Sequence, residues 1–211
     1  WLSAEYALLP AATQVRTNRE ISVMKRQGRS IEISRLISRA LRTVIDLTVI
    51  GERTITVDCD VLLADGGTRT ASITAAYAAL LMAQQEWLAS GVITKPVLID
   101  GIAAVSVGVM KDNQLILDLD YEEDSSAIAD INVIMTYSGK LIELQGGAEK
   151  ESVSWDIIPK IGQLATQAVF TMRDFISANP APAVTADVLK QSPKTALFSL
   201  ANRQSRQLAA P

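Results

Sequence analysis

The chain has 211 residues, of which 48% are hydrophobic and 20% charged, and its formal net charge is −3. These values are typical of one ordinary globular domain. The sequence contains no histidine. That excludes catalytic centres that need an imidazole, such as a Ser/His/Asp triad or an HExxH zinc site. Any chemistry must use carboxylates, Lys and Arg, hydroxyls, backbone amides or a bound ion.

Cysteine content and hydropathy indicate the compartment. Cys59 is the only cysteine, so no disulfide can form within the chain. A lone thiol is typical of a reducing compartment, and no segment approaches the ~20 apolar residues of a membrane span. We therefore expect a soluble cytoplasmic protein. The chain begins at Trp1, inside a strand-like segment and without an initiator Met, so we expect that an N-terminal piece is missing.

The first half of the chain has the pattern of an α/β unit. Helical spacing of apolar residues predicts a helix from residue 30 to about 46, and strict alternation predicts a strand over 54–61. A glycine turn then leads into an alanine-rich helix over 70–88, and Gly91 follows at the position where glycine often ends helices. Strand, glycine turn and helix in this order indicate the α/β (α+β) class.

The second half alternates apolar runs with short polar turns. It predicts one hairpin over 102–110 and 114–121, another over 131–137 and 140–145, and a last amphipathic helix over 156–177. We expect mixed sheets packed against helices in a single domain over 1–177. Residues 178–211 contain several prolines and few large apolar residues, so we expect a disordered tail.

Positive charge is concentrated in one N-terminal segment. Residues 16–42 contain eight Lys or Arg and two Glu, a net charge of +6 within an acidic chain. Such a segment is either a solvated helix face with its loop or a surface for an anionic partner. The sequence alone leaves both interpretations open.

The turn before the alanine-rich helix is a candidate oxyanion site. In Gly66-Gly67-Thr68-Arg69, glycine permits close approach of the backbone, and the amides of a helix start point at a ligand. Thr68 offers a hydroxyl for the ligand or a cap for the helix. Arg69 offers a guanidinium, whose positive charge opposes the helix dipole at this end, so a bound anion explains its position better than helix stability does. The alternative is a tight connection with a surface arginine.

A similar arrangement precedes the earlier helix. Gly28-Arg29-Ser30 places a glycine, an arginine and a capping hydroxyl at a helix start. Two arginines at two helix starts are able to hold one phosphate between them. Periodicity alone does not decide whether the two starts lie close together.

Carboxylates gather after the first hairpin. The segment 118–130 holds six acidic residues and no basic one. Such a cluster repels itself unless a cation or a polar partner compensates it, and Mg²⁺ is commonly held by one or two carboxylates plus substrate oxygens. Solvated loop carboxylates are the alternative. Together with the two arginine sites, the cluster suggests phosphoryl chemistry on an anionic polymer.

Five segments resemble bacterial ribonuclease PH, in order and at similar spacing. They are WLSAEYALLP (1–10), GRSIEISRL (28–36), ITVDCDVLLADGGTRTASIT (55–74), LDLDYEEDSSAIADIN (117–132) and ELQG (143–146). The resemblance covers about residues 1–175 and is most specific at DGGTRTASIT and LDYEED. It implies a ribonuclease PH-like catalytic domain over 1–177 that is incomplete at its N-terminus.

The resemblance also implies an activity and a site. The activity is a phosphorolytic 3′→5′ exoribonuclease, or tRNA nucleotidyltransferase, that trims precursor tRNA and rRNA with inorganic phosphate and releases nucleoside diphosphates. The implied residues are Arg29, Gly67, Thr68 and Arg69 for phosphate, Asp124 and Asp130 for catalysis and Mg²⁺, and Arg16 and Arg19 for RNA. The implied assembly is a homohexamer, a trimer of dimers.

Two other interpretations stay open at this point. The chain is also compatible with a non-catalytic, RNA-binding ring subunit of an exosome-like assembly. A third interpretation is a truncated, inactive fragment.

Overall fold

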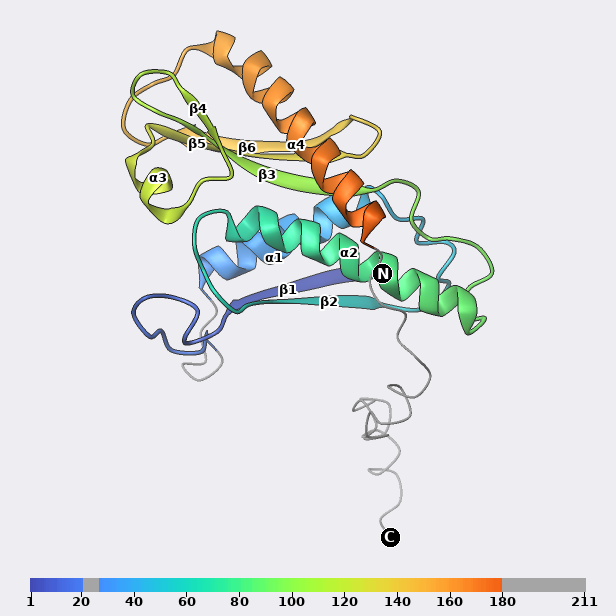
Figure 1. The fold of residues 1–211 in the computed structure, drawn as a ribbon. Helices are drawn as coiled ribbons and strands as arrows, with labels where there is room; N and C mark the ends of the chain where they lie inside the picture. Colours follow the sequence, from blue (N-terminus) through green and yellow to red (C-terminus); the bar gives the residue numbers. More distant parts are fainter. Residues whose placement is uncertain (21–26, 180–211) are drawn as a thin grey trace. The chain divides into compact units, whose positions relative to one another are not determined.

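A computed structural model of the chain describes residues 1–20 and 27–179 (Figure 1). Its elements in chain order are β1 (Leu2–Leu8), α1 (Gly28–Arg42), β2 (Ile55–Val61), α2 (Thr68–Ala89), β3 (Ile102–Val109), β4 (Leu115–Leu117), α3 (Tyr121–Ser126), β5 (Ala129–Thr136), β6 (Leu141–Ala148), the 3-10 turn η2 (Trp155–Ile157) and α4 (Ile158–Ala178). The expected tail lies almost wholly in residues 180–211, outside the described residues.

The strands form two sheets. β1 and β2 are parallel, from Leu2 opposite Ile55 to Leu8 opposite Val61, with α1 between them in the chain. The other four strands form an antiparallel sheet in the order β4-β3-β5-β6. The predicted mixed α/β class is therefore confirmed, including the strand, glycine turn and helix of the first half and the two hairpins of the second, although β4 is shorter than expected.

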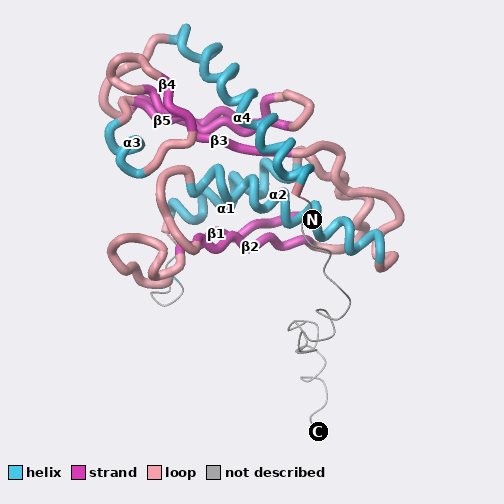
Figure 2. Tube along the Cα trace, viewed as in Figure 1, coloured by secondary structure: helices cyan, strands magenta, loops and turns pink. Residues whose placement is uncertain are grey.

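Helices and sheets are stacked in layers (Figure 2). α1 and α2 lie between the two-stranded and the four-stranded sheet, and α4 covers the other face of the four-stranded sheet. β3 is buried along its whole length. Its residues Ile102 and Ala104 face the core around α1 and α2, while Val105 and Val107 face the core under α4. Burial on both faces explains why this strand has no polar alternation.

Two local expectations need correction. α1 ends at Arg42 rather than near residue 46, where the chain turns at Thr43 through a bond to the Ala40 carbonyl. The acidic segment is not only a loop, because it contains α3. Asp120 caps that helix by accepting from the Glu123 amide, and the Glu123 side chain accepts from the Asp120 amide, which is a capping box.

A bulge in β6 sets which side chains face α1. Between Ile134 and Met135 of β5 the register slips, so that Met135 pairs with Leu141 and Ile134 with Glu143. Ile142 packs against the core around α1, and Glu143 bonds Arg39 of α1. Two consecutive residues thus face the same side of the sheet, as a bulge permits.

None of the helices that the structure describes is long and apolar enough to cross a membrane.

Candidate functional site

The glycine turn between β2 and α2 is pressed against the start of the acidic segment. A Cβ atom on Gly66 would lie 1.9 Å from the Leu119 carbonyl oxygen, so only glycine fits there. Gly67 precedes α2 with φ 69°, a left-handed conformation that favours glycine. Asp65 Oδ1 also accepts from the Tyr121 amide at 2.7 Å. The predicted phosphate turn and the predicted acidic segment are therefore joined.

Arg69, in the first turn of α2, is held by a carboxylate. Its Nη2 donates to Glu32 Oε2 of α1 at 3.0 Å, and its side chain is only 19% exposed. The other oxygen of Glu32 accepts from Gln145 Nε2 of β6, also at 3.0 Å. The guanidinium that was expected to bind an anion is thus also part of a chain of contacts across α2, α1 and β6.

Thr68 and Gly67 are surrounded by polar groups. The Thr68 hydroxyl lies 2.9 Å from the Tyr6 hydroxyl of β1 and does not cap α2. Beside Gly67, the position of an added Cβ lies 3.4 Å from the Ser106 hydroxyl and 3.7 Å from Asp118 Oδ1. Ser106 is buried, and its hydroxyl has no partner in the part of the chain that the structure describes. The turn therefore has hydroxyls and a carboxylate close to it.

The start of α1 differs from the expected arrangement. Arg29 is exposed in the first turn and bonds to none of residues 1–20 or 27–179. The expected capping role of Ser30 is wrong, because the residue before the helix is Gln27 and no side chain caps it. The Ser30 hydroxyl instead donates to Glu20. Arg29 is consequently free to meet a ligand.

The two predicted catalytic aspartates interact with each other. Asp124 lies in α3 and Asp130 in β5. Partial burial, followed by the negative charge of Asp130, raises the pKa of Asp124 above its ordinary value, whereas Arg29 and Arg69 act to lower it. The charges of Asp130 and of both predicted phosphate-binding arginines therefore all affect the pKa of Asp124. The structure brings together the residues that the sequence placed at separate elements.

The two predicted RNA-binding residues belong to the segment after β1. Arg16 and Arg19 are exposed in the segment that follows β1, which Figure 1 draws as a dark-blue loop. No contact described in the structure connects either of them with Arg29, Arg69 or Asp124. Their predicted role in RNA binding stays a prediction.

The acidic pair is compatible with a hard cation. Within the described residues, the side chains of Asp124 and Asp130 accept no hydrogen bond, so their oxygens are available. No group of three Asp, Glu, Cys or His in the described ranges is arranged to hold a metal. Two carboxylates suit Mg²⁺ only when substrate oxygens complete the coordination. The donor set therefore fits a cation that binds together with a phosphate substrate.

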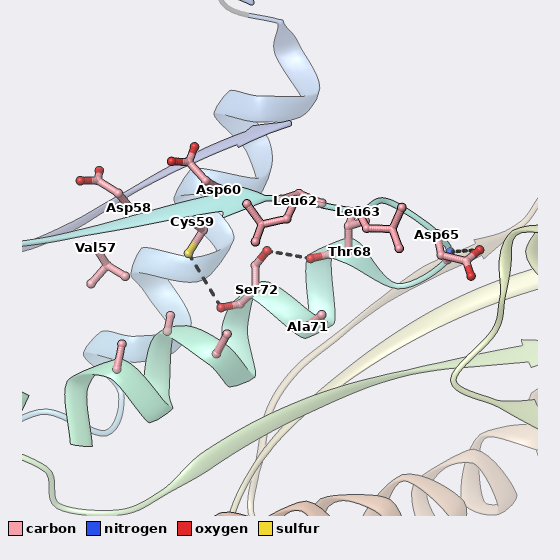
Figure 3. A pocket seen from close by; sticks show the side chains of 15 residues that line it. Val57, Asp58, Cys59, Asp60, Leu62, Leu63, Asp65, Thr68, Ala71 and Ser72 are labelled. Atoms are coloured by element: carbon pink, nitrogen blue, oxygen red, sulfur yellow. Dashed lines mark hydrogen bonds between the residues drawn. The ribbon is translucent and has the colours of Figure 1, made fainter. Parts of the chain in front are cut away.

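A groove along β2 and α2 adjoins the glycine turn (Figure 3). Cys59 points from β2 toward α2, with its sulfur 3.9 Å from the Ser72 carbonyl oxygen, whereas Asp58 and Asp60 point away. Thr68 lines this groove, but Arg29, Arg69, Asp124 and Asp130 do not. Burial, and secondarily the two aspartates, raises the pKa of Cys59 to about 11. Its thiol is thus largely protonated at neutral pH, which makes it a poor nucleophile.

Comparison with known proteins identifies the family. The sequence profile of the 3′ exoribonuclease family, domain 1, matches residues 1–86, and that of domain 2 of the same family matches residues 100–168. Ribonuclease PH of Bacillus velezensis is 51% identical over 172 residues, which are 82% of this chain and 70% of that protein. Ribonuclease PH of Bacillus subtilis is 50% identical over 174 residues, 82% of this chain and 71% of that protein.

The chain belongs to the 3′ exoribonuclease family. Solved structures show the same fold at lower identity. Rice Rrp46 superposes with a TM-score of 0.64 at 20% identity, covering 85% of this chain and 73% of that one. The Archaeoglobus fulgidus exosome with RNA bound to the active site gives 0.65 at 17% identity, covering 83% and 70%. The expected resemblance to bacterial ribonuclease PH is confirmed.

Within this member of the 3′ exoribonuclease family, sequence reasoning overlooked several side chains at the site. Glu32 and Gln145 both bond within the Arg69 network, and Ser106 lies beside Gly67. Glu32 and Gln145 stand inside the two short motifs GRSIEISRL and ELQG, so the motifs contained the signal. Only the fold shows that these two motifs touch each other.

Proposed function

We propose that this protein is a phosphate-dependent 3′→5′ exoribonuclease, a tRNA nucleotidyltransferase that trims the 3′ ends of precursor tRNA and rRNA. One observation carries the proposal beyond family membership. The carboxyl of Asp124 interacts at once with Asp130, Arg29 and Arg69. An acidic pair beside two arginines at helix starts is what a reaction between an inorganic phosphate and a phosphodiester needs, because both reactants are anions.

Inorganic phosphate is the nucleophile in this proposal. Arg29, Arg69, the Thr68 hydroxyl and the backbone at Gly67 would bind it at the start of α2, where the helix dipole favours an anion. One phosphate oxygen attacks the phosphorus of the last phosphodiester of the RNA, and the bond to the 3′ oxygen of the preceding nucleotide breaks. The products are a nucleoside diphosphate and an RNA shortened by one nucleotide.

The acidic pair serves the other side of the reaction. The departing 3′ oxygen takes up a proton, and Asp124 and Asp130 are the two candidates to donate it. The same carboxylates would hold Mg²⁺, which when bound supplies positive charge next to the phosphoryl group. The raised pKa of Asp124 supports the role of proton donor, and the unbonded carboxylate oxygens of the pair support the role of cation ligand.

The proposal extends to the RNA, the assembly and the compartment. Arg16 and Arg19 are exposed and cationic, as residues that contact RNA phosphates are.

We also propose a homohexamer, a trimer of dimers, in the cytoplasm. Static light scattering of the purified protein tests the assembly, because a hexamer has about six times the monomer mass and a monomer would contradict it.

The activity is tested with 3′-extended tRNA, Mg²⁺ and varied inorganic phosphate. We expect nucleoside diphosphates whose rate of release depends on phosphate, and no release without it. Asp124→Asn provides the matched inactive variant, since it removes one carboxylate from the pair with little change of shape. Release of nucleoside monophosphates in the absence of phosphate would overturn the proposal, as would RNA binding without any trimming.

A further inference from the structure

Arg69 is the residue of the proposed phosphate site whose orientation depends most on its neighbours. An arginine in the first turn of a helix opposes the helix dipole, and a free arginine side chain samples many rotamers. In this structure the Arg69 side chain is instead 19% exposed and bonded to Glu32. The ion pair fixes a guanidinium that would otherwise be mobile.

Glu32 is itself fixed from a third element. One of its oxygens accepts from Arg69 Nη2 and the other from Gln145 Nε2, each at 3.0 Å. Gln145 stands next to Gly146 in β6, and a Cβ on Gly146 would lie 2.2 Å from the Asp130 carbonyl oxygen in β5. The anchor of Glu32 therefore sits on a strand tightly apposed to the one that carries Asp130.

The remaining donors of Arg69 indicate which edge is left for an anion. Its Nε is buried and without a partner among the described residues, as is Gln145 Oε1. No bond from its Nη1 to a described residue is present, and Nη2 makes one described bond, to Glu32. Nη1 and the second N–H of Nη2 are therefore the donors left for an anion.

We propose that Glu32 and Gln145 are positioning residues that hold Arg69 in the orientation in which it binds inorganic phosphate. The inference rests on the proposed function, because it assigns the phosphate of that reaction to Arg69. Positioning of this kind lowers the entropy that the arginine loses when the anion binds. The negative charge of Glu32 also repels the anion, and in this proposal the gain in binding from a correctly held Arg69 is larger than the loss from that repulsion.

These two effects of Glu32 have opposite signs, which makes the test decisive. Glu32→Gln removes the repulsion and also the ionic partner of Arg69. If Glu32 acted only through its charge, phosphate would bind more tightly to the variant. If it positions Arg69, the Kd for inorganic phosphate rises about 10-fold, the size expected when a hydrogen bond to a charged carboxylate is replaced by a weaker one to a neutral amide oxygen.

The chain offers a matched control. Arg39 Nε donates to Glu143 Oε2 at 2.9 Å, and this pair also joins α1 to β6. Glu143→Gln therefore breaks an Arg–Glu pair between α1 and β6, the two elements that the Glu32–Gln145 bond also joins, without touching Arg69. Gln145→Leu is a second variant, which keeps both charges of the Arg69 pair but removes the anchor of Glu32, and we expect a smaller rise of about 3-fold.

The experiment measures phosphate binding by calorimetry, RNA binding without phosphate, and steady-state kinetics on the full chain. We expect Glu32→Gln to raise Kd and KM for phosphate with little change in kcat or RNA affinity, and Glu143→Gln to leave all four near wild type. Equal or tighter phosphate binding by Glu32→Gln, or equal losses in both variants, overturns the inference. If Glu32→Gln does not fold, unchanged phosphate binding by Gln145→Leu overturns it.

A separate result identifies failure of the proposed function itself. If the wild-type protein binds no phosphate, or if Arg69→Ala binds it as well as wild type does, the phosphate site is wrong and the positioning role falls with it. If wild type binds phosphate and Arg69→Ala does not, the site stands. The Glu32 variants then decide the positioning role alone.

Discussion

The starts of α1 and α2 have similar sequences and different surroundings. Each presents a glycine and an arginine, Gly28-Arg29 in one and Gly67-Thr68-Arg69 in the other. At α2 each of these groups is held by its surroundings: Gly67 is in a left-handed conformation, the Thr68 hydroxyl bonds Tyr6, and the largely enclosed Arg69 side chain bonds Glu32. At α1, a Cβ on Gly28 would meet nothing within 4 Å and Arg29 is exposed.

This difference suggests a division of labour at the proposed phosphate site. Fixed donors at α2 suit the recognition of one anion in one orientation, because their geometry is set before binding. The exposed Arg29 at α1 suits a longer-range role, because a solvated charge acts without a defined geometry and is screened by salt. Similar motifs therefore need not contribute equally to one site.

The largest expected effect comes from the glycines. In Gly66→Ala the new Cβ would lie 1.9 Å from a backbone oxygen, so the turn and the acidic segment must move apart. We expect a loss of stability on the order of 3–5 kcal/mol, together with loss of trimming. Urea denaturation measures the first and nucleoside diphosphate release the second.

Gly28→Ala is the matched change at the other helix start. Gly28 has an open environment and no positive φ, and alanine favours helix more than glycine does. We expect a gain of about 0.5–1 kcal/mol. A loss of stability as large as that of Gly66→Ala would show that the two starts are equally constrained.

The next effect separates the two arginines. Lysine keeps the positive charge but lacks the planar fork that is needed to hold Glu32 and an anion at once. We expect Arg69→Lys to lower kcat/KM for phosphate about 100-fold, in the range seen when a fixed donor is removed from a site. Arg29→Lys should retain most of the activity, and equal losses in the two variants would contradict the division of labour.

How much of this site the sequence could predict depends on the range of the contacts involved. The turn at Gly67 and the capping box at Asp120 are local, and their residues stand close together in the chain. The contact between Glu32 and Gln145 spans 113 positions. It requires α1 to lie under β6 and the bulge to set the register, and neither follows from periodicity.

The same reasoning explains the errors at α1. Ser30 was expected to cap the helix from its local pattern, but the helix begins two residues earlier and the hydroxyl bonds Glu20 instead. Arg29 was expected at a helix start and is found there. The local pattern thus predicted correctly that Arg29 lies at a helix start. It did not predict the bond of the Ser30 hydroxyl, because several polar side chains near one helix end compete for the same hydrogen-bonding groups.

A smaller effect compares the two arginines through the pKa of Asp124. Arg29 lowers this pKa more than Arg69 does. We expect Arg29→Gln to raise the pKa of Asp124 further than Arg69→Gln does. Carboxyl NMR titration measures both shifts, and the reverse order would contradict the comparison.

The direction of the pH effect on stability follows from the same group. Burial and Asp130 hold the folded pKa of Asp124 above its unfolded value. Protonated Asp124 therefore favours the folded state, and this contribution is lost as the pH rises through the folded pKa. Asp130→Asn removes the like charge, so it should lower the pKa of Asp124 and narrow the pH interval over which stability is lost.

The smallest effect tests the bond that ties α2 to β1. Tyr6→Phe removes the hydroxyl that lies 2.9 Å from the Thr68 hydroxyl and leaves the ring in the core. We expect a loss of about 1 kcal/mol in the free energy of unfolding, with an unchanged denaturant m-value. Tyr121→Phe is the control, because Tyr121 is 61% exposed and its hydroxyl bonds to none of the described residues.

The effect of Tyr6→Phe on phosphate binding decides what the bond does. If the Thr68 hydroxyl must be oriented for the anion, the Kd for phosphate rises along with the loss of stability. If the start of α2 is already fixed by its glycines and by the Arg69 pair, stability falls and the Kd does not change. The closely packed turn at Gly66 favours the second result, since backbone contacts hold the turn whether or not the hydroxyl is bonded.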